Sequence, residues 1–311
     1  MNTAKVLVIA GPTAVGKTEY AIRACNAFNG EIVSCDSMQI YRFMDIGSAK
    51  PTAEERDRAV HHLVDFVDPR ENFSAAEYQK LALEAIHDIL SRGKLPVISG
   101  GTGLYLNSIL YDMDFGGEGA DSEYRSYLER LAEEKGDPVL HDMLRARDPV
   151  GAENIHPNNR KKIIRALERL NSGESSLRPF SSVCRKRQEF EAVLLGLTRD
   201  RELLYERINS RVDKLMEMGL VDEVRQLMNM GLDKEDISMK GIGYKEIFEY
   251  LEGRMSLDET ILLIKKNTRH YAKRQLTWFR RYDKMRWYNL SEYLNDERAF
   301  EDIEEWLRKK L

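Results

Sequence analysis

The sequence predicts an α/β fold in which helices flank a parallel sheet and an inserted, mostly helical lobe interrupts the chain. Two observations support this prediction. Through the first third of the chain, apolar runs of strand length alternate with segments of helical periodicity, and that order is typical of a parallel sheet. A charged stretch without long apolar runs then occupies 115–190, before a further strand-like run appears. An insertion into one domain would produce this pattern.

In the first third, strands are expected over 5–11, 31–36 and 96–101, because each is a short apolar run bounded by turn residues. Helices are expected over 17–28 and 74–92, where apolar residues recur at the spacing of one helical face. Parallel strands joined by helices form right-handed crossovers. Ligands of such sheets bind at the carboxyl ends of the strands, so functional residues should gather there.

The pattern continues after the insertion. The apolar run at 191–198 predicts a strand that returns the chain to the sheet. A single amphipathic helix is expected over 201–230, with Arg207 and Arg211 on one face because they are four residues apart. A serine followed by a glutamate, at 256–259, has the spacing of a capping box that opens a basic C-terminal helix.

Composition is that of an ordinary globular protein. With 311 residues, 42% of them hydrophobic and 32% charged, the chain can bury a sizeable core. We divide it into a core, 1–114 with 191–311, and a lobe, 115–190. No apolar run reaches membrane-spanning length, and the early run at 6–10 has the length of a strand rather than of a signal peptide.

The three cysteines, Cys25, Cys35 and Cys184, form neither a C-x-x-C pair nor an even framework. Zinc and disulfides are therefore not indicated, and a reducing cytoplasm is expected. Nothing in the sequence indicates an obligate protein partner, so a monomer is expected.

The residues GPTAVGKT have the spacing of a P-loop: glycine, four residues, glycine, lysine and a hydroxyl residue. In such a loop the backbone N–H groups and the following helix N-terminus bind phosphate. Lys17 adds a positive charge, and the Thr18 hydroxyl is placed to hold a magnesium ion. The sheet is therefore expected to be P-loop NTPase-like, although the motif does not say whose phosphates are bound. The predicted phosphate-binding residues are Gly11, Pro12, Thr13, Ala14, Val15, Gly16, Lys17 and Thr18.

Two further polar groups follow neighbouring strands of the predicted sheet. Asp36 ends the second strand, and the sequence SGGTG at 99–103 ends the third. Because the carboxyl ends of parallel strands meet at one edge, both should lie near the P-loop. A carboxylate in this place can bind magnesium, cap a turn or act as a general base, and physical reasoning alone leaves all three open.

The formal net charge of −4 disfavours a nucleic-acid partner, but the basic residues are clustered. One tract lies within 160–187 and contains only two acids, Glu168 and Glu174; a second, within 265–286, is interleaved with aromatic residues. Such tracts suit an RNA backbone with unstacked bases, although a solvated helix face explains either tract alone equally well. The tracts comprise Arg160, Lys161, Lys162, Arg165, Arg169, Arg178, Arg185, Lys186 and Arg187, then Lys265, Lys266, Arg269, Lys273, Arg274, Arg280, Arg281, Lys284 and Arg286.

Five motifs in order, GPTAVGKT, CDSMQIYRFMDIGSAKPT, SGGTGLYL, KGIGYKE and YAKRQLTWFR, resemble those of the bacterial tRNA dimethylallyltransferases, also called tRNA isopentenylpyrophosphate transferases. The resemblance spans 11–287 and is weakest within 115–190. It implies transfer of a dimethylallyl group from dimethylallyl diphosphate to N6 of adenosine at tRNA position 37. It also implies that the P-loop binds this prenyl diphosphate with Mg²⁺, whereas the motif alone would suggest ATP.

The resemblance assigns roles to individual residues. Asp36 would accept the N6 proton, because the amine lone pair is delocalised into the ring and the amine is a poor nucleophile. Arg211 would stabilise the departing diphosphate together with Lys17 and a magnesium ion on Thr18. Thr102 would contact the substrate base or orient Asp36. Arg207 is interpreted as a solvated or supporting residue.

Contacts with tRNA are expected near the target base, in the lobe, at the turn 240–245 and on the C-terminal helix. His61 and His62 are adjacent on a strand and so point to opposite faces, which favours a structural role over a metal pair. Trp278 either stacks on a base or packs in the core. The expected tRNA-binding residues are Asp36, Ser37, Met38, Gln39, Thr102, Tyr124, Asn159, Arg160, Lys161, Lys162, Ile163, Lys240, Gly241, Gly243, Tyr244, Lys245, Lys273 and Arg274.

Three other functions share some of these features. A small-molecule phosphotransferase would need lid arginines for a second phosphate, but not two basic tracts. A nucleic-acid-dependent ATPase would need an acidic residue at the end of a further strand, and the third strand ends in SGGT. Prenylation of a free adenine nucleotide would leave the lobe and the basic C-terminus without a partner to bind.

Overall fold

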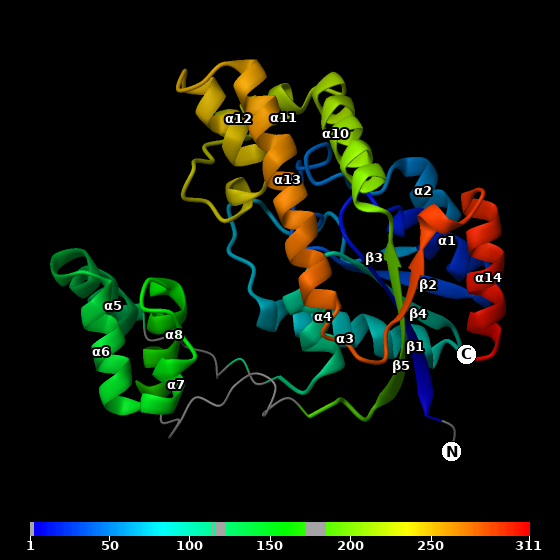
Figure 1. Cartoon of the computed structure of the whole chain (residues 1–311), viewed down its shortest axis with the longest axis horizontal. Coiled ribbons are helices and arrows are strands. Elements are labelled where there is room, and N and C mark those ends of the chain that lie inside the picture. The colour runs from blue at the N-terminus through cyan, green and yellow to red at the C-terminus, as the bar shows by residue number, and fades with distance from the viewer. Residues whose placement is uncertain (1–2, 114, 116–121, 172–184) are drawn as a thin grey trace. The chain divides into compact units, whose positions relative to one another are not determined.

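The computed structural model describes residues 3–113, 115, 122–171 and 185–311. The chain forms two compact units, one comprising Met1–Leu110 and Arg187–Leu311 and the other Tyr111–Lys186 (Figure 1). Each boundary lies four residues before the expected one, because the bridge between Tyr111 and Lys186 belongs to the lobe. The expected features at Glu174, Arg178 and Cys184 lie outside the described residues.

Within the described residues, six strands form one parallel sheet of order β3-β2-β4-β1-β5-β6. Strand β1 lies between β4 and β5 and is buried from Val6 to Ala10, which explains its uninterrupted apolar sequence. The strands are β1 (Ala4–Ala10), β2 (Gly30–Cys35), β3 (His61–His62), β4 (Leu95–Gly100), β5 (Phe190–Thr198) and β6 (Arg286–Asn289). The expected α/β fold with a parallel sheet is confirmed, and four expected strands lie within one residue of β1, β2, β4 and β5.

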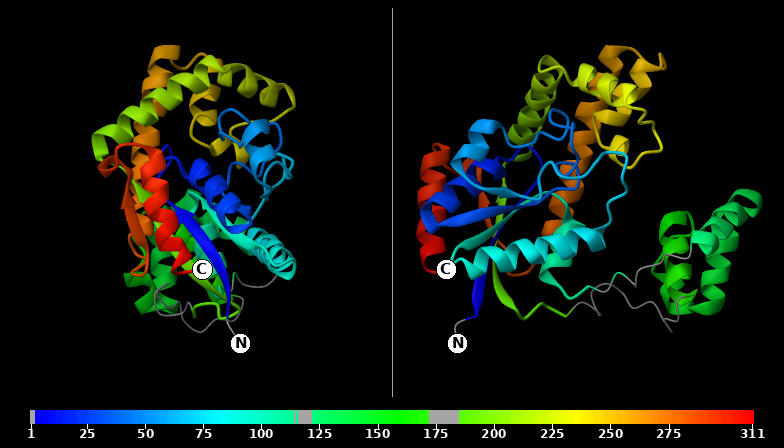
Figure 2. Two further views of the ribbon diagram at one scale, coloured as in Figure 1. Left: turned by 90° about the vertical axis from the view of Figure 1, so that its right-hand side faces the viewer. Right: turned by 180° about the vertical axis from the view of Figure 1, so that it is seen from behind.

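Helices cover both faces of the sheet. On one face α1 (Lys17–Phe28) and α14 (Asp296–Arg308) pack against the side chains of Leu7 and Ile9. On the other, α3 (Ala75–Ser91) packs beside α4 (Gly103–Leu110), with the rings of Tyr78 and Tyr105 stacked at 3.8 Å. This placement follows from right-handed crossovers, because the chain moves from β1 to β2 and then back to β4. Figure 2 shows the layers from two further sides.

The prediction of one continuous helix over 201–230 is wrong. In place of a single helix over 201–230 there are two, α10 (Arg201–Glu217) and α11 (Leu220–Asn229). Gly219 separates them with a φ of 96°, a left-handed conformation that glycine adopts without steric cost. After them come η1 (Ser238–Lys240), α12 (Tyr244–Leu251) and α13 (Leu257–Phe279). The expected capping box is confirmed at the start of α13, where Ser256 and Glu259 exchange hydrogen bonds.

The smaller unit is helical in its described residues. It contains α5 (Ser122–Lys135), α6 (Asp137–Arg147), α7 (Pro149–Glu153) and α8 (Arg160–Asn171). A separate core that includes Leu128, Leu140, Leu144 and Leu167 holds these helices together. No helix in the described part of the chain combines the length and the apolar character needed to cross a membrane.

A buried carboxylate near the amino end of β2, away from the P-loop, joins several basic side chains by hydrogen bonds. Glu31, 3% exposed in β2, accepts hydrogen bonds from both Nη atoms of Arg92 at 2.5 and 2.7 Å, from Lys94 Nζ at 2.7 Å, and pairs with His62 Nε2 at 2.7 Å. Arg92 above all, with Lys94 and His62, holds the pKa of the Glu31 carboxyl well below its usual range. His62 therefore has a structural contact within the sheet, with Glu31.

We expect Glu31→Gln to lower the free energy of unfolding at pH 7 by about 2 kcal/mol, because hydrogen bonds to a charged group are lost while Arg92 and Lys94 can turn to water. The folded-state pKa of Glu31 is depressed, so its contribution is present above the unfolded pKa of about 4.3. It is lost as the pH falls through the folded pKa. Urea unfolding of wild type and variant at pH 7 and at pH 3 should therefore give a smaller difference at the lower pH.

Glu191→Gln is the matched control, because Glu191 is exposed and its ion pair with Lys5 spans 4.0 Å. Such surface pairs contribute little to stability. Equal destabilisation by the two substitutions would contradict the role given to Glu31.

Candidate active site

A pocket of about 590 Å³ opens at the carboxyl ends of the strands in the larger unit. The P-loop, the end of β2, the segment 47–51, α10, the turn 240–245 and α13 all contribute to it. Its polar and charged lining residues include Thr13, Lys17, Thr18, Glu19, Ser34, Asp36, Ser37, Gln39, Ser48, Glu55, His61, Arg211, Lys240, Lys245, Thr268, Arg274 and Gln275. The pocket lies at the edge of the sheet where the sequence predicts that functional residues gather.

The P-loop takes its shape from close packing on β5. A Cβ atom on Gly11 would lie 2.5 Å from the carbonyl oxygen of Leu197, so only glycine fits at this point. Ala14 and Gly16 both have positive φ, at 63° and 115°. Helix α1 begins directly after this tight turn, and its second residue, Thr18, lines the pocket.

Lys17 lies inside the pocket and bends back over the loop. Its Nζ donates to the carbonyl oxygens of Gly11 at 3.0 Å and Pro12 at 2.8 Å. Burial lowers the pKa of Lys17 to about 8, the charge of Asp36 raises it and that of Arg211 lowers it. Lys17, Asp36 and Arg211 all line the same pocket.

Asp36 and Arg211 reach this space from different elements. Asp36 follows β2, and its Oδ1 accepts a hydrogen bond from the Met38 N–H at 2.9 Å. Arg211 comes from α10; burial lowers the pKa of its guanidinium, and the charge of Asp36 counters that effect. Both residues line the pocket, as do Ser37, Met38 and Gln39.

Thr102 holds the backbone next to Asp36 by hydrogen bonds. Its N–H donates to the Cys35 carbonyl at 3.0 Å, and its hydroxyl oxygen accepts from the Ser37 N–H at 3.0 Å. Thr102 thereby fixes the backbone on both sides of Asp36. Of its two expected roles, orienting Asp36 has a geometric basis here.

Gln275 in α13 was missed by sequence reasoning. Its Oε1 accepts from the Thr13 N–H at 2.8 Å, and its Nε2 donates to the Gly101 carbonyl at 2.9 Å. This buried amide therefore joins the P-loop to the loop after β4. The signal in the sequence is its place in the motif YAKRQLTWFR, where it is a neutral residue among basic ones.

Tyr244 and Glu223 shape another wall of the pocket. The Glu223 carboxylate accepts from the N–H groups of Asp45, Ile46 and Gly47 at 2.8, 2.7 and 3.0 Å. The Tyr244 hydroxyl donates to Glu223 at 2.8 Å and accepts from the Ser48 N–H at 3.0 Å. Since Tyr244 is fully buried, a direct tRNA contact by its side chain has no basis in this structure; its neighbours Lys240, Gly241, Gly243 and Lys245 do line the pocket.

The candidate tRNA-binding residues of the lobe also differ in how far their side chains are exposed. Ile163 is fully buried in the lobe core, so its side chain offers no surface to a partner. Lys161 and Lys162 are exposed at the start of α8. Arg160 pairs with Asp137 at 2.5 Å. Two further candidates are partly buried: Asn159, which precedes α8, and Tyr124, which packs against the core.

The basic face of α13 lies beside the pocket. Lys273 and Arg274 are exposed, and the Arg274 guanidinium lies 5.6 Å from the ring centroid of Tyr271. Of the two roles considered for Trp278, packing has a geometric basis. Its ring lies against Gly103 at the start of α4, so close that a Cβ atom on Gly103 would be 2.4 Å from it. The ring of Trp278 is thus held in the fold.

The sheet order and the P-loop at the end of β1 define a protein with a P-loop NTPase-like fold, and Lys17, Asp36 and Arg211 line the pocket beside this loop. A family model described as IPP transferase matches residues 39–282. The chain therefore belongs to the IPP transferase family.

Individual relatives agree over nearly the whole chain. The chain is 51% identical to a tRNA dimethylallyltransferase of Alkaliphilus oremlandii, over 96% of each chain, and 49% identical to one of Acetivibrio thermocellus, over 97% of each. A solved tRNA isopentenylpyrophosphate transferase of Bacillus halodurans matches with a TM-score of 0.74 and 43% identity, over 98% of this chain and 96% of that one. A eukaryotic dimethylallyltransferase solved acting on tRNA matches with a TM-score of 0.77 and 30% identity, over 89% of this chain and 70% of that one.

Proposed function

We propose that the protein transfers a dimethylallyl group from dimethylallyl diphosphate to N6 of adenosine 37 in tRNA, next to the anticodon. The observation that supports this most directly is the meeting of Lys17, Asp36 and Arg211 at one pocket beside the P-loop. A cationic phosphate site and a carboxylate face each other there, as a reaction with an anionic leaving group and a proton-losing nucleophile requires. The names of the relatives supply the prenyl donor class and the tRNA acceptor.

The chemistry consists of one displacement. The N6–C1 bond forms while the C1–O bond to the diphosphate breaks, and the electron pair of that bond leaves with the diphosphate. Asp36 accepts the N6 proton, which prevents charge from building on the amine. Lys17, Arg211 and the P-loop N–H groups stabilise the charge that develops on the leaving group.

A magnesium ion fits this site. Thr18 is the hydroxyl residue that ends the P-loop motif and lines the pocket beside Lys17, and a hydroxyl oxygen with phosphate oxygens is a ligand set that Mg²⁺ accepts. When bound, the ion would neutralise part of the diphosphate charge.

We further propose that tRNA binds across the exposed basic residues of α13 and, in the lobe, of α8. Lys273 and Arg274 lie on α13 next to the pocket, and Lys161 and Lys162 are exposed on α8. We also propose that the protein acts as a monomer in a reducing cytoplasm.

The deciding experiment is mass spectrometry of nucleosides after tRNA lacking the modification is incubated with the protein, dimethylallyl diphosphate and Mg²⁺. We expect N6-dimethylallyladenosine, formed only at position 37. A parallel reaction with ATP and tRNA should release no phosphate above background. Phosphate release stimulated by tRNA, without prenylation, would favour the nucleic-acid-dependent ATPase instead, and prenylation of AMP at the rate of tRNA would favour the free nucleotide.

The salt dependence of tRNA binding tests the α13 surface. The logarithm of the affinity should fall linearly with the logarithm of the salt concentration, because basic residues release counterions from phosphates. Lys273→Ala with Arg274→Ala should reduce that slope by about one to two units and weaken binding to all tRNAs alike.

The matched control replaces Arg298 of α14 and Lys309, which directly follows this helix; each is exposed and paired with a glutamate of α14. This control should leave the slope unchanged. If the α13 double variant also leaves affinity and slope intact, α13 presents a solvated face and the lobe carries tRNA binding.

A further inference from the structure

Two arginines outside the pocket hold the outward-facing carbonyl groups of the P-loop. Arg199, which directly follows β5, donates from Nε to the Val15 carbonyl at 3.2 Å. Arg207, in α10, donates from Nε to the Ala14 carbonyl at 3.0 Å. Neither residue lines the pocket, so any effect that they have on a ligand passes through the loop.

The peptide geometry gives these contacts a directional consequence. In a trans peptide unit the C=O and N–H groups point in opposite directions. The Val15 carbonyl shares its unit with the Gly16 N–H, so a donor that holds this carbonyl outward aims the N–H inward. Gly16 lines the pocket. The left-handed φ of 63° at Ala14 is unfavourable for a residue with a Cβ atom, and such conformations persist only where the surroundings impose them.

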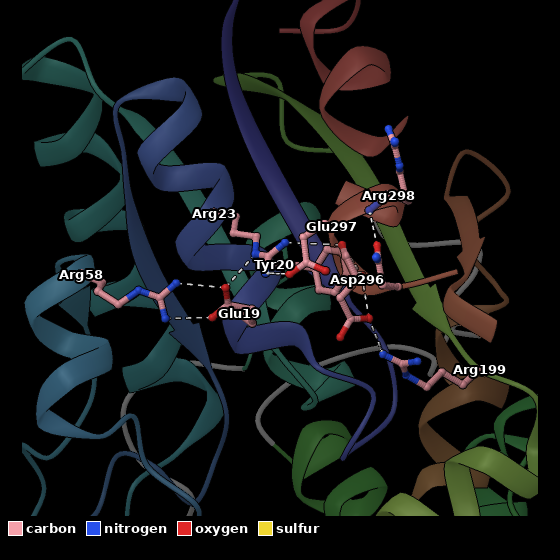
Figure 3. Close-up of polar contacts among 9 residues, drawn as sticks. Glu19, Tyr20, Arg23, Arg58, Arg199, Asp296, Glu297 and Arg298 are labelled. Atoms are coloured by element: carbon pink, nitrogen blue, oxygen red, sulfur yellow. Dashed lines mark hydrogen bonds and ion pairs between the residues drawn. The ribbon is translucent and has the colours of Figure 1, made fainter. Parts of the chain in front are cut away.

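Asp296, the first residue of α14, holds Arg199 in place (Figure 3). Its Oδ1 accepts from Arg199 Nη2 at 2.7 Å and from the hydroxyl of the buried Tyr20 at 3.2 Å. Tyr20 belongs to α1, two residues after Thr18. One carboxylate thus connects the residue behind the P-loop to the helix that the loop opens.

The same figure shows how this contact is reinforced around α1. Arg23 donates to the Asp296 carbonyl at 3.5 Å and to Glu297 at 3.3 Å. Glu19 accepts from Arg23 at 2.7 Å, and it also pairs with Arg58 of α2 (Ala53–Arg58) at 2.9 Å. The start of α14 is therefore fixed to α1 by several polar contacts rather than by one.

We propose that Arg199 and Asp296 are positioning residues of the diphosphate site, through which the C-terminal helix keeps the P-loop amides aimed at the ligand. Arg199 is suited to this because its side chain is only 12% exposed and its planar fork contacts a carbonyl and a carboxylate at once. Arg199 reaches the two partners from two different nitrogens, Nε and Nη2, whereas a lysine would have only one nitrogen, at the end of its side chain, to place between them. The inference rests on the proposed function of the P-loop as the prenyl diphosphate site.

Steady-state kinetics with each substrate varied in turn test the proposal. Arg199→Ala should raise the KM for dimethylallyl diphosphate by roughly 10- to 100-fold, the equivalent of one charge-assisted hydrogen bond, while the KM for tRNA stays near the wild-type value. Arg199→Lys should fail to restore it, although the charge is kept. Asp296→Asn, which retains an acceptor oxygen, should have a smaller effect in the same direction. The double variant of Arg199→Ala with Asp296→Asn should be no worse than Arg199→Ala, because both act through one contact.

Arg298→Ala is the matched control, since Arg298 lies on α14 but its side chain is 67% exposed and pairs with Glu301 at 2.6 Å. It should leave both KM values unchanged. Inhibition by inorganic diphosphate provides a second readout of the P-loop, and thermal unfolding reports whether each variant is folded. If Arg199→Ala does not fold, Arg199→Lys and Asp296→Asn carry the test.

Unchanged KM for the prenyl donor and unchanged inhibition by diphosphate in folded variants would overturn the proposal and leave the function intact. An equal rise in the KM for tRNA would also overturn it, because the effect would then be general. If wild type neither transfers the prenyl group nor binds diphosphate, the proposed function itself is wrong.

Discussion

Asp36→Asn should retain tRNA binding while lowering turnover roughly 100- to 10,000-fold, the loss typical of removing a general base. Asparagine has nearly the same shape and keeps the Oδ1 that accepts from the Met38 N–H, so the turn after β2 should survive. The amide cannot accept the N6 proton. Single-turnover measurement of prenyl transfer to tRNA, with both substrates bound, isolates this step.

Asp222→Asn is the control for this substitution. Asp222 is exposed on α11 and pairs with the nearby Arg225, so it has no contact with the pocket and its variant should react at the wild-type rate. Near-normal turnover by Asp36→Asn would remove Asp36 from the role of base. Loss of tRNA binding instead would make Asp36 a recognition residue.

Lys17→Met should lower kcat/KM for dimethylallyl diphosphate by roughly 100- to 1,000-fold, as removal of one group that stabilises a developing anion does. Methionine keeps the length of the side chain and removes the charge. Affinity for tRNA should change little. The rate measured at saturating tRNA, with the prenyl donor varied, gives the result.

The pH dependence of the wild type should report the same lysine. Its pKa is lowered to about 8 by burial, so in the free enzyme the ammonium loses its proton as the pH rises past that value. Diphosphate binding requires the charged form, and kcat/KM for the donor should therefore decline above about pH 8. Asp36 raises the pKa of Lys17, so Asp36→Asn should move the decline in diphosphate affinity to lower pH.

Lys17→Met should abolish this alkaline decline in diphosphate affinity, because the titrating group is gone. A decline that persists unchanged in the variant would assign it to another group. Lys245→Met serves as the control, since Lys245 also lines the pocket but lies in α12, and its ammonium is 3.6 Å from Glu246; its pH profile should follow the wild type.

Local sequence determined much of the core. The P-loop motif placed the first helix at Lys17–Phe28 without error, because the loop spacing and the following periodicity are both local. The run at 191–198 was recognised as a strand because β5 is buried beside β1. Asp36 was placed at the pocket because the carboxyl ends of parallel strands meet at one edge.

Short and broken elements were harder to predict. Gly219 divides the expected helix over 201–230, yet a glycine within a periodic pattern does not by itself show that the helix ends there. Strand β6 is four residues long and, among the residues that the structure describes, pairs with β5 alone; a run this short does not stand out from the basic tract that it follows. Tyr244 was expected to contact tRNA because it lies in a motif, but its hydroxyl is used by Glu223.

By itself, the sequence determined the fold class, the place of the P-loop motif, the carboxylate at the end of β2 and the family to which the chain belongs. Only the tertiary structure decided which residues hold these groups in place. Gln275 contacts Thr13 across 262 residues of chain, and Arg199 contacts Val15 across 184. Periodicity shows which face of an element is buried, but it carries no information about which distant side chain lies opposite. The supports of the site therefore appear only when the chain is folded.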